Sequence, residues 1–317
     1  MSAADAVIGA GAPVLAIDVG GTGVKAGLFD DRGVLRHTRT EPTARGGDGT
    51  ASALVSQVRG LTHRFAREVP GISPAVVGLS VPGIVNERTG TAVFSSNLGW
   101  RDAPIQALAE DALGLPVAFG HDVRAACLAE YELGAAKGAR DAVILTVGTG
   151  IAGGIIVGGR LAIADGYAGE IGHAPLDPSG PACACGARGC VEQIASASAI
   201  RRRYEERSGT PVTGSREVRE RADAGDAVAE QVWAEAIDAL ALTIGQLTAF
   251  LGPEVVAIGG GLSRAGDALF TPLRRGVQRL LSFHRLPQIV PAALLDDAGL
   301  LGTALRARAV SAEKATP

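Results

Sequence analysis

Short apolar runs alternate along the chain with longer segments of helical periodicity. Runs too short for helices predict buried strands at Val14–Val19, Ala75–Val81, Asp141–Val147 and Val255–Ile258. Helical periodicity predicts helices at Ala51–Glu68, Ala103–Leu113, Ala197–Arg207, Ser215–Ala224 and Ala227–Phe250, and further helices that begin near Asp122, Ser263 and Gly299. Strands that alternate with helices predict an α/β fold.

Two of the predicted strands run into a glycine turn that another strand follows. Gly20–Gly23 lies between Val14–Val19 and an alternating strand, V-K-A-G-L-F-D, and Gly148–Gly150 comes shortly before a β-branched run. The backbone N–H groups of such turns can form an anion-binding nest, although an ordinary tight hairpin has the same sequence. The repeated unit predicts two similar lobes, each with a phosphate-sized glycine hairpin, and a nucleotide held in the cleft between them.

Two common nucleotide motifs are excluded by their context. Residues 148–153 spell G-x-G-x-x-G, but a strand follows where the dinucleotide-binding fingerprint requires a helix. The first hairpin is not a P-loop, because Lys25 is followed by Ala26. A third glycine run, Gly259–Gly261, also follows a predicted strand. It would suit an adenine or a ribose lying on bare backbone, or it is simply a tight turn before a helix.

The stretch 165–192 holds a complete tetrahedral set of zinc ligands: His173, Cys183, Cys185 and Cys190. Met1–Pro13 lacks the features of a signal peptide, so we expect a cytoplasmic chain with reduced thiols and favour a metal over disulfides. Thiols without a metal, or redox chemistry, stay open as alternatives. Cys127 lies in an Ala-rich helical pattern and is expected to be a buried filler. Glu170 and Glu192 bracket the cluster.

Composition limits the possible partners. The chain has 317 residues, a net charge of −3, 44 glycines and an aromatic content of only 4%. The length predicts two lobes, and the charge argues against binding to nucleic acid. The basic run Arg201–Arg203 is interpreted as a solvated helix face. The apolar runs are interrupted by Gly or by charge, so no membrane span is predicted.

Two polar residues are candidates for a site. Asp122 lies where a predicted strand passes into a helix, a position that suits a helix cap and also a ligand-binding group. Asn97 lies in a predicted turn beside Trp100, where its amide could form the turn or bind a sugar hydroxyl.

Several motifs together resemble the ROK family of bacterial sugar kinases, nearest to its glucokinase type. They are D-V-G-G-T-G-V-K, V-P-G, N-L-G-W, the helix start at Asp122, G-T-G-I-A-G-G-I, G-E-I-G-H, C-A-C-G-A-R-G-C-V-E and I-G-G-G-L. The cysteine motif and the G-E-x-G-H before it are specific, whereas each glycine motif alone is weak. The family also contains repressors, but too few residues precede the first hairpin for a helix-turn-helix unit.

The resemblance implies an actin-like ATPase (ribonuclease H-like) fold with two similar lobes and a nucleotide and sugar cleft between them. We expect a small lobe at 1–121 and a large lobe at 122–298 that contains the zinc loop 165–192. The closing helix, about 299–312, is expected to pack back on the small lobe. The implied reaction is ATP-dependent phosphorylation of a hexose, with glucose as the leading substrate, which places the chain in carbohydrate metabolism and glycolysis.

The resemblance also implies roles for individual residues. Asp122 would be the general base. Sugar contacts would come from Asn97, Asp122, Glu170, His173 and Glu192. The nucleotide would contact Asp18, Gly20, Gly21, Thr22, Lys25, Gly148, Thr149, Gly150, Gly259, Gly260 and Gly261. Mg²⁺ would accompany ATP near Asp18, and a structural zinc would hold His173 and Glu192 in place without touching the reacting atoms.

The sequence departs from the family pattern beside the expected base. His121 stands where the family usually has Asn, and Arg124 stands where a small or amide residue is common. If either side chain reaches the pocket, the preferred sugar could differ from glucose. The alternatives are a kinase for another hexose or an N-acetylhexosamine, a polyphosphate-dependent kinase, and a non-catalytic sugar sensor. A homodimer or homotetramer is expected by resemblance only.

Overall fold

The computed structural model describes residues 6–95 and 98–315, and these divide into two compact units. The first unit consists of residues 1–134, 163–168 and 296–317, and the second of residues 135–162 and 169–295. The division differs from the one expected at residue 122, because the helix that begins there belongs to the first unit. The expected zinc loop 165–192 is also divided, since its first residues lie with the first unit.

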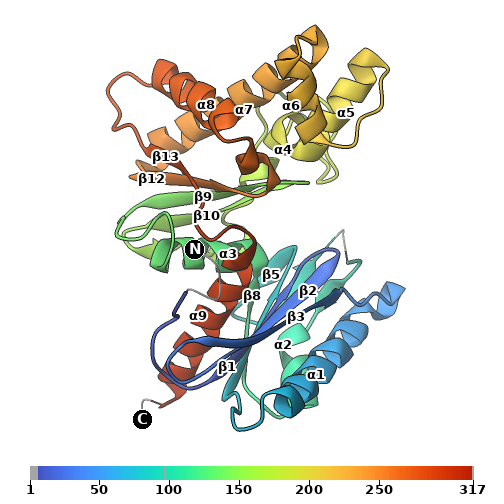
Figure 1. The fold of residues 1–317 in the computed structure, drawn as a ribbon, viewed down its shortest axis with the longest axis vertical. Coiled ribbons are helices and arrows are strands. Elements are labelled where there is room, and N and C mark those ends of the chain that lie inside the picture. Colours follow the sequence, from blue (N-terminus) through green and yellow to red (C-terminus); the bar gives the residue numbers. More distant parts are fainter. Residues whose placement is uncertain (1–5, 96–97, 316–317) are drawn as a thin grey trace. The chain divides into compact units, whose positions relative to one another are not determined.

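The first unit is built on a five-stranded sheet in the order β3-β2-β1-β4-β8 (Figure 1). The strands are β1 (Val14–Val19), β2 (Gly23–Phe29), β3 (Leu35–Pro42), β4 (Val76–Val81) and β8 (Val117–His121). A smaller sheet contains β5 (Ile84–Asn86), β6 (Thr91–Phe94) and β7 (Arg101–Ala103). The helices of this unit are α1 (Thr50–Glu68), α2 (Ile105–Leu113), α3 (Asp122–Glu132) and α9 (Ala298–Ala315).

Helices cover both faces of this sheet, which is why its central strands read as continuous apolar runs. Leu15 and Ile17 of β1 face the core shared with α1 and α2. On the other face α9 packs against β1, β4 and β8 and lies beside α3. The contact is close, because a Cβ atom on Gly78 of β4 would lie 2.5 Å from the Thr303 carbonyl oxygen of α9.

The second unit repeats this sheet topology in the order β11-β10-β9-β12-β13. Its strands are β9 (Ala142–Val147), β10 (Ile151–Val157), β11 (Arg160–Leu161), β12 (Val255–Gly259) and β13 (Gln288–Pro291). In each sheet the first three strands of the order pair antiparallel and the remaining two pairings are parallel. The predicted internal repeat is therefore present, and the two related sheets give the actin-like ATPase fold.

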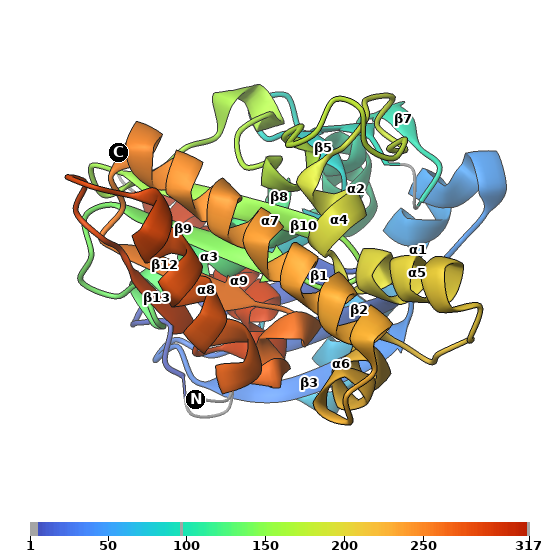
Figure 2. The ribbon, with the colours of Figure 1, turned by 90° about the horizontal axis from the view of Figure 1, so that it is seen from above.

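One face of the second sheet is covered by helices (Figure 2). They are α4 (Val191–Ala195), α5 (Ala197–Ser208), α6 (Ser215–Asp223), α7 (Ala227–Leu251) and α8 (Asp267–Leu280). Among the described residues, α7 is the one helix long and apolar enough to cross a membrane by length and composition. Half of its most apolar window is buried, and its residues Val232, Leu240 and Ile244 lie in the core of this unit, as in a core helix of a globular protein.

Two predicted helix boundaries were wrong for identifiable reasons. The helix expected from Ala103 begins at Ile105, because residues 101–103 pair with β6 and Pro104 lies at the start of the helix. The helix expected to follow Ser263 is split into a 3₁₀ turn, η4 (Gly261–Ala265), and α8. Gly266 separates the two with φ +57 and ψ −133, a conformation outside the helical region.

Candidate functional site

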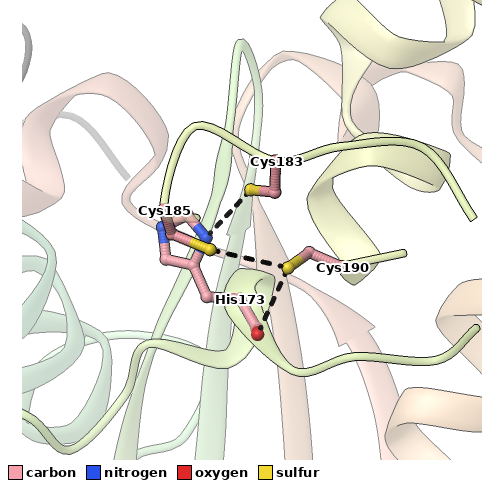
Figure 3. A group of neighbouring side chains, drawn as sticks. All are labelled: His173, Cys183, Cys185 and Cys190. Atoms are coloured by element: carbon pink, nitrogen blue, oxygen red, sulfur yellow. Dashed lines mark hydrogen bonds between the residues drawn. The ribbon is translucent and has the colours of Figure 1, made fainter. Parts of the chain in front are cut away.

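The four predicted metal ligands converge in the second unit (Figure 3). The Nδ1 atom of His173 lies 3.6 Å from Cys183 Sγ, and the Cys185 and Cys190 sulfurs are 3.7 Å apart. All four ligand atoms lie within 4.8 Å of one another. Ligands at zinc bond lengths of about 2.1–2.3 Å stand about 3.5–3.8 Å apart in a tetrahedron, and the 3.6 and 3.7 Å separations match this spacing.

Backbone geometry brings the cysteines together. Gly186 and Gly189 have φ values of +95 and +63, which non-glycine residues rarely adopt. A Cβ atom on Gly189 would lie 1.6 Å from the Asp177 carbonyl oxygen, so only glycine fits there. All four cysteines of the chain are free, and a sulfur separation of 3.7 Å excludes a disulfide between Cys185 and Cys190.

The electrostatics of the thiols suit a cation. The Ala187 backbone N–H lowers the pKa of Cys185 and so favours its thiolate form. Burial raises the pKa of Cys190 to about 12, so this thiol needs a nearby positive charge to ionise. A bound metal ion supplies that charge and deprotonates a coordinating thiol outright. Nδ1 of His173 faces the sulfurs, so Nε2 is the ring nitrogen that is left for a contact with another group.

The two predicted glutamates lie on the elements that carry the metal ligands. Glu170 immediately precedes η3 (Ile171–His173), and its carbonyl oxygen accepts a hydrogen bond from the His173 N–H at 3.0 Å. Glu192 is in the first turn of α4, two residues after Cys190. Its Oε2 atom accepts a hydrogen bond from the Ile151 backbone N–H at 2.8 Å, a contact that the sequence did not indicate.

Both glycine hairpins have the predicted strand–turn–strand form. Gly20 N–H donates to the Gly23 carbonyl oxygen at 2.8 Å, and Gly148 N–H donates to that of Gly150 at 2.9 Å. The strand after the second turn confirms that residues 148–153 are not a dinucleotide fingerprint. In the first hairpin, Lys25 forms an ion pair with Asp297, at the start of α9. A nucleotide contact by Lys25 therefore stays a prediction.

The third glycine run lies beside the second hairpin, because β12 pairs parallel to β9 and brings Gly259 opposite Thr146. A Cβ atom on Gly148 would lie 3.9 Å from the Gly261 nitrogen. Gly261 and Leu262 line a cavity of about 570 Å³, whose other lining residues are Ser215, Arg216, Arg219, Glu220, Trp233, Arg264 and Ala265. The second unit therefore places this cavity next to the Gly148–Gly150 turn.

Asp18 is held by residues that sequence reasoning missed. The Ser80 hydroxyl donates to Asp18 Oδ1 at 2.7 Å and lies 2.7 Å from the Thr303 hydroxyl. A Cβ atom on Gly299 would lie 2.2 Å from Asp18 Oδ2, so the start of α9 packs directly on the carboxylate. Ser80 could have been suspected, since it is the one polar residue in the apolar run of β4.

Two carboxyl groups of the first unit have strongly raised pKa values. Burial raises the pKa of Asp122 to about 6, against the opposing effect of the Val123 N–H, which donates to Oδ1 at 2.7 Å. Burial and the charge of Asp122 raise the pKa of Asp18 to about 7. Raised carboxyl pKa values are typical of groups that must accept protons near neutral pH. The predicted sugar ligand Asn97 lies outside the described residues.

The two unusual residues near Asp122 have structural roles. His121 is the N-cap of α3, and its Nδ1 accepts a hydrogen bond from the Arg124 N–H at 3.3 Å. Burial lowers the pKa of His121 to about 3, so its ring is neutral, and Nε2 lies 3.3 Å from Asp122 Oδ1. The Arg124 side chain is 2% exposed and binds Glu87 and the carbonyl oxygens of Val85 and Gly166. Arg124 therefore links β5, its following turn and residue 166 within the first unit.

The comparisons with known proteins agree with this arrangement. The model of the ROK family matches residues 14–310. The glucokinase of Streptomyces coelicolor is 32% identical over 93% of this chain and 97% of its own length. The N-acetylmannosamine kinase of Shigella flexneri is 34% identical over 93% of this chain and 98% of its own. A ROK glucokinase from Streptomyces griseus, solved with glucose and AMPPNP, superposes with a TM-score of 0.78 at 30% identity and covers 94% of this chain and 99% of that one. The chain therefore belongs to the ROK family.

Proposed function

We propose that this protein is an ATP-dependent hexose kinase that phosphorylates the 6-hydroxyl of its sugar, with glucose as the preferred substrate. The observation that carries the proposal is Asp122, a partly buried carboxyl group at the start of α3 whose pKa is raised to about 6. Such a group is ionised at neutral pH and still basic enough to accept the proton of a hydroxyl.

In the proposed reaction, Asp122 takes the proton of the sugar hydroxyl as its oxygen attacks the γ-phosphorus of ATP. The bond between that phosphorus and the β,γ-bridging oxygen breaks, and ADP leaves. Phosphoryl transfer depends mainly on positioning and charge neutralisation. Asp18 would hold Mg²⁺ through water, and the ion would offset the charge of the phosphates. The pKa of Asp18 is raised to about 7, and a bound cation would favour its ionised form.

The second unit would supply further sugar contacts through Glu170, His173 and Glu192. Zinc would bind Nδ1 of His173 and fix the tautomer in which Nε2 carries a proton for a sugar hydroxyl. Support comes from the position of the two glutamates, Glu170 immediately before η3 and Glu192 in α4. Asn97 is proposed as a further sugar ligand on the sequence resemblance alone.

The donor is proposed to be ATP. Support comes from the cavity of about 570 Å³ beside Gly261, a volume in the range of small-molecule sites. A polyphosphate chain would instead require unpaired basic groups. Three arginines line this cavity, and two of them pair with acids of their own helix, Arg216 with Glu220 and Arg219 with Asp223. The Gly148–Gly150 turn next to the cavity is the proposed site of the phosphates.

The test is a coupled assay of ADP release with glucose, mannose, allose, N-acetylglucosamine and N-acetylmannosamine, with zinc content measured on the same sample. N-acetylmannosamine is included because the similar Shigella protein is a kinase for it. We expect turnover with ATP, fastest on glucose. Turnover with polyphosphate alone would identify polyphosphate as the phosphate donor in place of ATP. Sugar binding without ADP release on any sugar would show a sensor instead of a kinase.

A further inference from the structure

Two elements that carry metal ligands meet at one residue of the second unit, Ile151. This residue is the first of β10 and directly follows the Gly148–Gly150 turn. Its N–H donates to Glu192 Oε2 at 2.8 Å. Its carbonyl oxygen lies against Gly172 of η3, where an added Cβ atom would approach to 2.0 Å. Ile151 is therefore held on its N–H side by α4 and on its carbonyl side by η3.

The same segment also holds the other end of the turn. After α4 the chain passes through Ser196, and the Ala197 N–H donates to the Gly148 carbonyl oxygen at 2.8 Å. Glu192 leaves no room for a side chain inside the turn, since a Cβ atom on Gly150 would lie 2.4 Å from its Oε2. The short segment 192–197 thus fixes both ends of the Gly148–Gly150 turn.

The metal ligands flank these contacts on both sides. His173 is the last residue of η3, and Cys190 is the residue immediately before α4. The Cys190 sulfur already lies 3.4 Å from the His173 carbonyl oxygen. A metal bound to both residues would hold η3 and α4 at a fixed separation, with Ile151 between them. Backbone contacts also join the two segments, since the Val191 N–H donates to the Ala174 carbonyl oxygen at 3.0 Å and Pro175 pairs with Cys190. A metal would add a direct link between His173 and Cys190.

We propose that Glu192 couples the metal cluster to the Gly148–Gly150 turn, so that metal occupancy sets the affinity of the turn for nucleotide phosphates. An anion-binding turn works only when its N–H groups point at one place. Loss of the Glu192 contact removes one restraint on the Ile151 end of the turn, which stays paired with Val147 of β9. Glu192 is thus a positioning residue for the nucleotide, in addition to its proposed contact with sugar. This inference rests on the proposed function in one respect, because it takes the turn to be the phosphate site.

The test measures Mg·ADP binding by titration calorimetry with no sugar present, so that sugar contacts cannot contribute. Glu192→Ala removes the acceptor and is expected to weaken ADP binding on the order of tenfold, the value of one charge-assisted hydrogen bond. Glu192→Gln keeps an acceptor oxygen and is expected to bind ADP nearly as the unmodified protein does. Asp177→Ala is the matched control, since this acid of the same loop accepts hydrogen bonds from Ser179 instead.

Metal is measured in every sample by mass spectrometry, and folding by near-ultraviolet circular dichroism. Removal of the metal with a chelator is expected to weaken ADP binding by a similar factor, and added Zn²⁺ to restore it. If the stripped protein unfolds, Glu192→Ala with a full complement of metal decides the question. Unchanged ADP affinity in that variant overturns the coupling. No ADP binding by the unmodified protein would refute the proposed donor site itself, which is a distinguishable result.

Discussion

The carboxyl group of Asp122 should make turnover depend on pH between about 5 and 7. Burial raises its pKa to about 6, so the fraction ionised rises from about one tenth at pH 5 to about nine tenths at pH 7. If Asp122 is the base, kcat/KM should rise about tenfold across this interval. An aspartate with an ordinary pKa would already be more than nine tenths ionised at pH 5, and the profile would be nearly flat.

The assay is ADP release at low sugar concentration with saturating Mg·ATP, repeated for Asp122→Asn. The amide is close in size but cannot accept the proton, so turnover should fall by about 10²–10⁴. The pH profile of the variant's residual activity is the control, because it contains the titration of every other group, including Asp18 and ATP itself. A flat profile between pH 5 and 8, or an Asn variant within tenfold of the unmodified protein, would refute the assignment of Asp122 as the base.

Three further predictions concern the metal, Asp18 and the buried arginine. Cys185→Ser should lose bound zinc and lower the unfolding temperature, whereas Cys127→Ser should keep its zinc; equal metal content in both would contradict the ligand set. The folded protein favours the protonated form of Asp18, because its pKa is raised to about 7. The contribution of this group to stability is therefore fully present below about pH 4 and is lost as pH rises through about 7. Asp18→Asn should therefore be a few kcal/mol more stable than the unmodified protein at pH 8, with a difference that shrinks toward pH 4, as measured by denaturant unfolding at both pH values. Arg124→Met should cost about 3–5 kcal/mol of unfolding free energy, because it takes one of two arginine partners from the buried Glu87, which keeps Arg306, and leaves two buried carbonyl oxygens without their donor; a cost below about 1 kcal/mol would contradict that role.

Much of the fold could be read from local pattern. The strands, the two glycine hairpins and most helix ends follow from apolar periodicity and from the residues that terminate it. The ligand set of the metal cluster also follows from sequence, since the four residues lie within eighteen positions and two glycines permit the tight loop. The errors at Ala103 and Ser263 arose where a strand pairing or a glycine conformation overrode the helical pattern.

Other features depend on contacts between distant segments. Neither Ser80 nor Thr303 carries a motif. Ser80 acquires its role because β4 pairs with β1 and sets it opposite Asp18, and Thr303 because α9 packs on both strands and brings it to Ser80. The position of Arg124 in the chain, two residues after Asp122, also allowed a side chain that reaches the pocket. The structure directs it into the first unit because Glu87 and two buried carbonyl oxygens offer it partners there.

The sequence by itself determined the residue types that can do chemistry here: a cysteine and histidine set for a metal, glycine turns for phosphate, and acids for a sugar. Residue type and short spacing are local properties, so they are legible without coordinates. Only the tertiary structure decided the state of those groups. The raised pKa of Asp122 and the Glu192 contact with Ile151 both arise from burial and from pairing across tens of residues, which no local pattern encodes.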